Sequence, residues 1–103
     1  MIEVIGTDAG APASLPPAHQ ELLRQSALVA APRRLHAALQ SWAGVSGPAL
    51  IASDQPEPLL EQLRGLDAGQ PAVVLASGDP LWFGIGRLLM EGLPADQLRF
   101  HPA

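Results

Sequence analysis

The sequence predicts an α/β fold, a Rossmann-like, open and mostly parallel sheet of about five strands flanked by about four helices. Apolar runs alternate along the chain with segments of helical periodicity, which is typical of βαβ units that build a parallel sheet. The clearest run, residues 72–76, is apolar throughout, as expected of a strand buried on both faces. A polar, glycine-containing segment follows it directly, and open α/β sheets bind ligands at such strand ends.

The first third of the chain predicts a strand, a loop, a helix and a second strand. We expect a strand over residues 2–5, followed over residues 6–15 by a loop rich in glycine, alanine and proline. A helix over residues 16–26 begins with proline, which suits the first helical turn. The apolar residues 27–31 then predict the second strand.

The middle of the chain repeats this alternation. Residues 33–42 carry apolar side chains one helical turn apart and predict an amphipathic helix that ends near Gly44. Residues 49–52 predict the third strand. Leucines recur at helical spacing through residues 56–66, where we expect a helix closed by a nearby glycine.

The last third of the chain completes the sheet. Residues 72–76 predict the fourth strand, residues 83–92 the fourth helix, and residues 98–100 the start of a fifth strand. A chain of 103 residues with 48% hydrophobic content is long enough for a single core. We therefore expect one small α/β domain.

The composition disfavours several classes of site. All six basic residues are arginine and the net charge is -4, so a broad nucleic-acid surface is not expected. Without lysine there is no P-loop or Schiff-base lysine, and without cysteine there is no disulfide, thiolate nucleophile or cysteine metal site. The sequence shows neither a leader pattern nor an apolar stretch of about 18 residues, so we expect a soluble, cytoplasmic protein that does not enter a membrane.

The segment after the fourth expected strand is the first candidate binding loop. Gly78 tolerates a positive φ, so a ligand can approach the backbone, and Pro80 disfavours a helical conformation of Asp79. Asp79 is therefore expected to project from a fixed loop at the carboxyl end of a strand. It either contacts a ligand or caps the following helix, a role that aspartate often has.

A second glycine-containing loop, with Gly6, Asp8 and Gly10, follows the first expected strand. The dinucleotide-binding fingerprint Gly-x-Gly-x-x-Gly is not met, because Asp8 stands where its second glycine is required. The Asp8 carboxylate would also repel a pyrophosphate. An NAD site is therefore disfavoured.

Three stretches carry a resemblance to a known family. They are Val4-Ile5-Gly6 through Gly10-Ala11-Pro12, Ala31-Pro32-Arg33-Arg34-Leu35, and Ala76-Ser77-Gly78-Asp79-Pro80-Leu81-Trp82-Phe83-Gly84-Ile85-Gly86, of which the last is the most specific. Together they resemble the tetrapyrrole methylases that use S-adenosylmethionine, and within them the precorrin-6Y C5,15-methyltransferases and cobalt-precorrin-7 C5-methyltransferases of cobalamin biosynthesis. The similarity extends over essentially all 103 residues, which look like the amino-terminal lobe of such an enzyme.

The resemblance implies a cofactor site. S-adenosylmethionine would lie between two lobes, against the loops after the first and fourth strands. Gly78, Asp79 and Leu81 are then the leading candidates for contacts with its methionine or ribose portion, and Gly6 and Gly10 would shape the floor. Methyl transfer from a sulfonium depends mainly on positioning, so it needs no covalent enzyme intermediate. No catalytic side chain is assigned.

Arg33 and Arg34 follow the second expected strand. The substrate that the resemblance implies is a precorrin macrocycle fringed with carboxylates, which arginine binds through paired hydrogen bonds. Alternatively, both are surface residues at a solvated helix start, although cations are unfavourable at a helix N-terminus. We interpret Arg33 as the better substrate ligand and Arg34 as the one better explained by solvation.

Two features depart from the family pattern. Asp8 replaces a glycine, and its carboxylate either accepts a hydrogen bond from a ribose hydroxyl or hinders the carboxylate of the cofactor. The second lobe, which would carry most of the macrocycle site, is expected outside these 103 residues, so we expect no methyl transfer by this lobe alone. The apolar face left for that lobe also predicts a homo-oligomer.

The histidines and aromatic residues carry weaker signals. His19, His36 and His101 lack the i, i+4 spacing of a helical metal site, so no metal is expected and each is interpreted as a surface residue. Trp82 and Phe83 either pack into the core or form an aromatic wall for adenine or the macrocycle.

A non-catalytic binding or assembly module is the competing interpretation. Such a Rossmann-like domain would dock a partner through the exposed end of its sheet. The short chain and Asp8 favour it, whereas the Gly78-Asp79-Pro80 loop argues against it because simple packing does not require that loop.

Overall fold

The computed structural model of the chain describes residues 1–7, 10–42, 49–66, 70–77 and 84–101. In this part of the chain five strands form one sheet, all of whose pairings are parallel, in the order β3-β2-β4-β1-β5. The predicted α/β class is therefore confirmed. The strands are β1 (Ile2–Thr7), β2 (Leu28–Ala31), β3 (Ala49–Ala52), β4 (Ala72–Ser77) and β5 (Leu98–His101).

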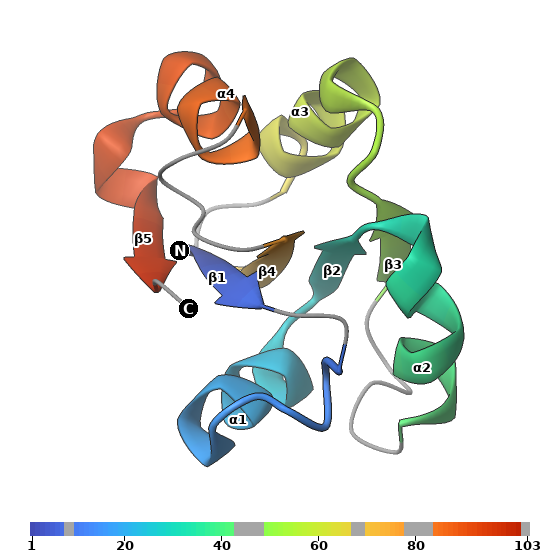
Figure 1. The fold of residues 1–103 in the computed structure, drawn as a ribbon. Helices are drawn as coiled ribbons and strands as arrows, with labels where there is room; N and C mark the ends of the chain where they lie inside the picture. Colours follow the sequence, from blue (N-terminus) through green and yellow to red (C-terminus); the bar gives the residue numbers. More distant parts are fainter. Residues whose placement is uncertain (8–9, 43–48, 67–69, 78–83, 102–103) are drawn as a thin grey trace.

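Helices cover both faces of the sheet (Figure 1). One pair lies on one face and the other pair on the opposite face. This division follows from the strand order, because β1, β2 and β3 succeed one another in one direction across the sheet and β4 and β5 return in the other, and parallel crossovers are right-handed. The pairs are α1 (Pro17–Gln25) with α2 (His36–Ser41), and α3 (Pro56–Arg64) with α4 (Gly84–Gly92).

The core consists of two apolar layers, one on each side of the sheet. Side chains alternate along each strand, so Val73 and Leu75 of β4 join the layer under α1 and α2, whereas Ala72 and Val74 join the layer under α3 and α4. All four of these side chains are at most 1% exposed. A strand buried on both faces has to be apolar throughout, which is the pattern that the sequence shows at residues 72–76.

Two element boundaries differ from the sequence prediction. β1 continues to Thr7, because Gly6 and Thr7 pair with Ala76 and Ser77 of β4. The helix expected over residues 33–42 is divided into a 3-10 turn, η1 (Arg33–Leu35), and the short α2. The turn forms because the Leu35 N–H donates to the Pro32 carbonyl at 2.9 Å, an i to i+3 bond.

The remaining boundaries agree within a few residues. Within the described residues a further 3-10 turn, η3 (Ala95–Gln97), precedes β5 and has no counterpart in the prediction. The expected helix end at Gly44 and the aromatic residues Trp82 and Phe83 lie outside the described residues. Among the described helices none is both long and apolar enough to cross a membrane.

We expect α4 to show a sharp contrast between two adjacent positions. Leu89 is fully buried, whereas Met90 is 49% exposed. Leu89→Ala should lower the free energy of unfolding by about 2–5 kcal/mol through the lost burial and the cavity it leaves. Met90→Ala should change it by less than about 0.5 kcal/mol. Urea unfolding followed by circular dichroism measures both, and equal effects would contradict this orientation of α4.

Candidate functional site

The carboxyl ends of β1 and β4 form the topological switch point of the sheet. The two strands are neighbours, and their last residues, Thr7 and Ser77, pair with each other. From here the chain leads from β1 to α1 on one face and from β4 to α4 on the opposite face (Figure 1). In open α/β sheets, ligands bind outside the carboxyl ends of strands at such a point.

Both predicted cofactor loops begin at this switch point. Gly6 is buried within β1, opposite Ala76, and Gly10 lies exposed in the turn after β1. Asp8, Gly78, Asp79 and Leu81 lie outside the described residues. The structure thus brings together the strand ends from which the two loops start.

The loop after β1 is anchored to the core and to its own backbone. Ala11 and Leu15 are buried in the apolar layer under α1 and α2. The Ser14 N–H donates to the Gly10 carbonyl and the Leu15 N–H to the Pro12 carbonyl, each at 3.1 Å. These contacts fix a loop that leaves Gly10 exposed next to the end of β1.

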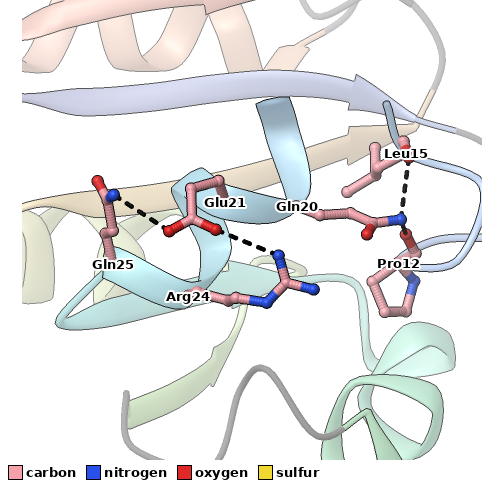
Figure 2. Close-up of polar contacts among 6 residues, drawn as sticks. All are labelled: Pro12, Leu15, Gln20, Glu21, Arg24 and Gln25. Carbon is pink, nitrogen blue, oxygen red and sulfur yellow. Dashed lines mark hydrogen bonds and ion pairs between the residues drawn. The ribbon is translucent and has the colours of Figure 1, made fainter. Parts of the chain in front are cut away.

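Gln20 clamps the same loop from α1 (Figure 2). Its side-chain Nε2 donates to the Leu15 carbonyl at 3.0 Å and approaches the carbonyls of Pro12 and Ala13 at 3.4 Å. Gln25, farther along α1, instead donates to Glu21 on the exposed side of the helix. The loop carbonyls are therefore satisfied by a side chain from the first turns of the helix that the loop precedes.

A second group of polar residues lies at the same edge of the sheet, after β2 and β3. The Arg33 N–H donates to Asp54 Oδ2 at 2.9 Å, and the Ser53 N–H donates to the Ala31 carbonyl at 2.9 Å. These bonds join the turns that follow the two strands. The side chains of Arg33 and Arg34 are exposed there, so both predicted substrate residues are brought to the carboxyl edge.

A small hollow of about 230 Å³ opens beside these turns. Arg34 and Asp54 line it together with the apolar Leu75, Ala76 and Ile85. Its wall therefore combines a cation, a carboxylate and the end of β4. A ligand that extends from the switch point toward β2 would meet this hollow.

A larger hollow, of about 560 Å³, lies at the opposite, amino edge of the sheet between α3 and η3. Its rim includes Arg64, whose Nε and Nη2 donate to the Gly92 carbonyl at 3.2 and 3.0 Å and tie α3 to α4. The described residues that line it lie at the amino ends of strands or near the ends of α3 and α4, not at the carboxyl end of a strand. We therefore place the candidate site at the switch point and not at the larger hollow.

The three histidines, which the sequence analysis interpreted as surface residues and not as metal ligands, are each partly buried and contact other residues. His36 is half-buried and its Nε2 donates to the Ala31 carbonyl at 2.8 Å. His19 and His101 are half-buried with their ring centroids 4.9 Å apart. The contact between His19 and His101 joins segments that are distant in the sequence, so no local sequence pattern indicates it.

Gln20 and Asp54 are further site residues that the sequence analysis did not single out. Asp54 follows a predicted strand directly, which is a usable signal for a residue at the carboxyl edge. Gln20 carries no such signal, because its role depends on how the loop folds back over α1.

No group of three or more histidine, cysteine, aspartate or glutamate residues within the described ranges is arranged to hold a metal ion. Comparison with known proteins adds no further assignment: no family model matches the chain, and no curated protein matches it. The assignment of the site therefore depends on its geometry and on the sequence stretches described above.

We expect the Gln20 clamp to stabilise the loop locally. Gln20→Met keeps the length of the side chain but removes the donor, so the free energy of unfolding should fall by about 0.5–1.5 kcal/mol. Amide exchange of Ser14 and Leu15 should become faster at the same time. Gln25→Met, an exposed control on the same helix, should change the stability by less than about 0.5 kcal/mol. Unchanged exchange in Gln20→Met would show that the clamp does not hold the loop.

Proposed function

We propose that this α/β unit is one lobe of an S-adenosylmethionine-dependent methyltransferase that acts on a precorrin macrocycle. The observation that carries the proposal is the position of the switch point. The switch point lies at the ends of β1 and β4, and these are the two strand ends after which the glycine-containing loops of the family resemblance begin. By the same resemblance the reaction is methylation at C5, with C15 in a fused parent, in cobalamin biosynthesis in the cytoplasm.

The residues at this edge fit such a cofactor in chemical type. Gly10 exposes backbone next to the end of β1, where a ligand can approach closely. In the sequence, Asp8 directly follows Thr7, and Asp79 follows Ser77 after a single glycine. Carboxylates accept hydrogen bonds from ribose hydroxyls, which is how acidic residues bind nucleosides in Rossmann-like sites. Gly6, Gly78 and Leu81 complete the proposed set.

The chain's own contribution to the reaction is positioning. The bound cofactor supplies an electrophilic methyl group, and the anchored loop after β1 would hold the nucleoside and methionine portions in one orientation. Arg33 and Arg34 would pair with carboxylates of the macrocycle at the turn after β2. A second lobe would close the other side of the site and bind most of the macrocycle.

A binding experiment tests the proposal without the macrocycle. Separate calorimetric titrations with S-adenosylhomocysteine, NAD and ATP should show binding of S-adenosylhomocysteine alone. Asp79→Ala should weaken this binding about tenfold to a hundredfold, because it removes a charged hydrogen-bond acceptor. Asp96→Ala is the matched control, since Asp96 lies exposed in η3 beside the amino edge.

The alternatives give different results. Preference for NAD or ATP would contradict the methyltransferase assignment. Absence of binding, both to this unit and to a chain carrying a second lobe, would favour the non-catalytic module.

A further inference from the structure

A carboxylate is buried in the middle of the sheet. Glu3 of β1 is 4% exposed and lies on the face that α1 covers, opposite Val73. Its Oε1 accepts hydrogen bonds from His101 Nε2 at 3.1 Å and from Arg99 Nη1 at 3.4 Å. Its Oε2 is buried and has no hydrogen-bond partner within the described chain. Burial of a charge is costly unless it is paired, so Glu3 depends on these two residues of β5.

α1 meets this pair through His19. The rings of His19 and His101 lie edge to face, with centroids 4.9 Å apart and an interplanar angle of 65°. Burial lowers the pKa of His19 below its ordinary range, the proximity of His101 lowers it further, and Glu3 opposes both effects. Three elements, β1, β5 and α1, therefore converge on one group of titratable side chains.

The charges around His19 come from a small set of residues. β1 contributes Glu3, and β5 contributes Arg99 and His101. The described part of β4 places apolar Val73 and Leu75 on this face. On α1 itself, Glu21 and Arg24 pair with each other at 3.2 Å on the exposed side.

One carboxylate thus faces several groups that are cationic or can become so. Arg99 is permanently charged, and its side chain is 60% exposed, so solvent weakens its interaction with Glu3. Whenever the His101 ring is positively charged, that charge lies next to the Glu3 carboxylate and strengthens their contact. A second proton, on His19, would place two imidazolium rings in contact above a single buried carboxylate.

We propose that Glu3, His101 and His19 form a proton-sensitive tie between β5 and α1. The tie tolerates one positively charged imidazole beside the Glu3 carboxylate and is loosened when both imidazoles are charged. The tie is independent of the proposed methyltransferase function. It reaches the candidate site nonetheless, because Gln20, which clamps the loop after β1, is adjacent to His19 on α1.

The direction of the pH dependence follows from linkage. In the unfolded chain His19 binds a proton near its ordinary pKa of about 6.5, whereas in the folded chain it binds one only at lower pH. The unfolded state therefore binds more protons. The contribution of His19 to stability is complete above about pH 6.5 and is lost as the pH falls through the lower folded value. A difference of one proton changes the folding equilibrium at most about tenfold per pH unit.

Proton NMR titration of the imidazole rings tests the tie. In the wild-type chain His19 should titrate at lower pH than in the unfolded chain. His101→Gln should raise the His19 midpoint, because it removes the second cation, and Glu3→Gln should lower it, because it removes the attracting carboxylate. His36→Gln, on α2 and outside the cluster, should leave it unchanged. A His19 midpoint that moves in neither cluster variant would overturn the proposal.

Two further measurements keep the proposal testable if a cluster variant fails to fold. His19→Gln should flatten the fall in stability between pH 7.5 and pH 5.5 that the wild-type chain shows in urea unfolding. In the wild-type chain, amides of β5 and α1 should lose protection from exchange over this range relative to amides of β2, after correction for the intrinsic rate. Parallel pH profiles of the wild-type chain and His19→Gln, or equal protection losses in β5 and β2, would refute the tie.

Discussion

In the centre of the sheet every residue of β1 pairs with β4, from Ile2 with Ala72 to Thr7 with Ser77, and the rest of the structure depends on this pairing. Both strands are interior, so each must place apolar side chains on two faces and cannot expose either. The helices then have to divide between those faces. The same register brings the two strand ends level, so that the loops after β1 and β4 start side by side.

The carboxyl edge shows how a polar site can be built on such an apolar sheet. Turns after strands carry backbone groups that must find partners. Here Asp54 satisfies the backbone of Arg33, and Gln20 satisfies the carbonyl of Leu15. Side chains, together with backbone hydrogen bonds within and between the turns, therefore fix these turns. Gly10 and the side chains of Arg33 and Arg34 are exposed at this edge.

The strands and helices could be predicted from the sequence because they are determined locally. Apolar runs and helical spacing placed all five strands and four helices within a few residues. The prediction failed in two places. Gly6 belongs to β1 because Ala76 lies opposite it in β4. Residues 33–35 form a 3-10 turn, and Arg33, its first residue, donates its N–H to Asp54 after β3. The contact of Glu3 with His101 joins the two ends of the chain, and no local pattern reports it.

The candidate site residues likewise divide into those with a local sequence signal and those whose role depends on the folded structure. The glycine-containing loops could be found because their residue types are distinctive and because they follow apolar runs. Gln20 could not, since glutamine is common on exposed helices and only the folded loop gives it three carbonyl neighbours. The burial of Glu3 could not be predicted either. The apolar residues around it predict a strand, but they do not show that this strand is covered on the face where Glu3 lies.

The strand order also has a consequence for how the chain acquires its structure. β2 and β3 are close in the sequence and adjacent in the sheet, so they can pair early. β1 lies between β4 and β5, which are the last two strands of this sheet in the sequence, so Ile2 cannot pair with Ala72 and Leu98 until both have been synthesised. Contacts between distant segments slow folding because long loops must close first. During translation the first strand therefore remains an unpaired apolar segment until nearly the whole domain has left the ribosome, which is a period of exposure to chaperones and to aggregation.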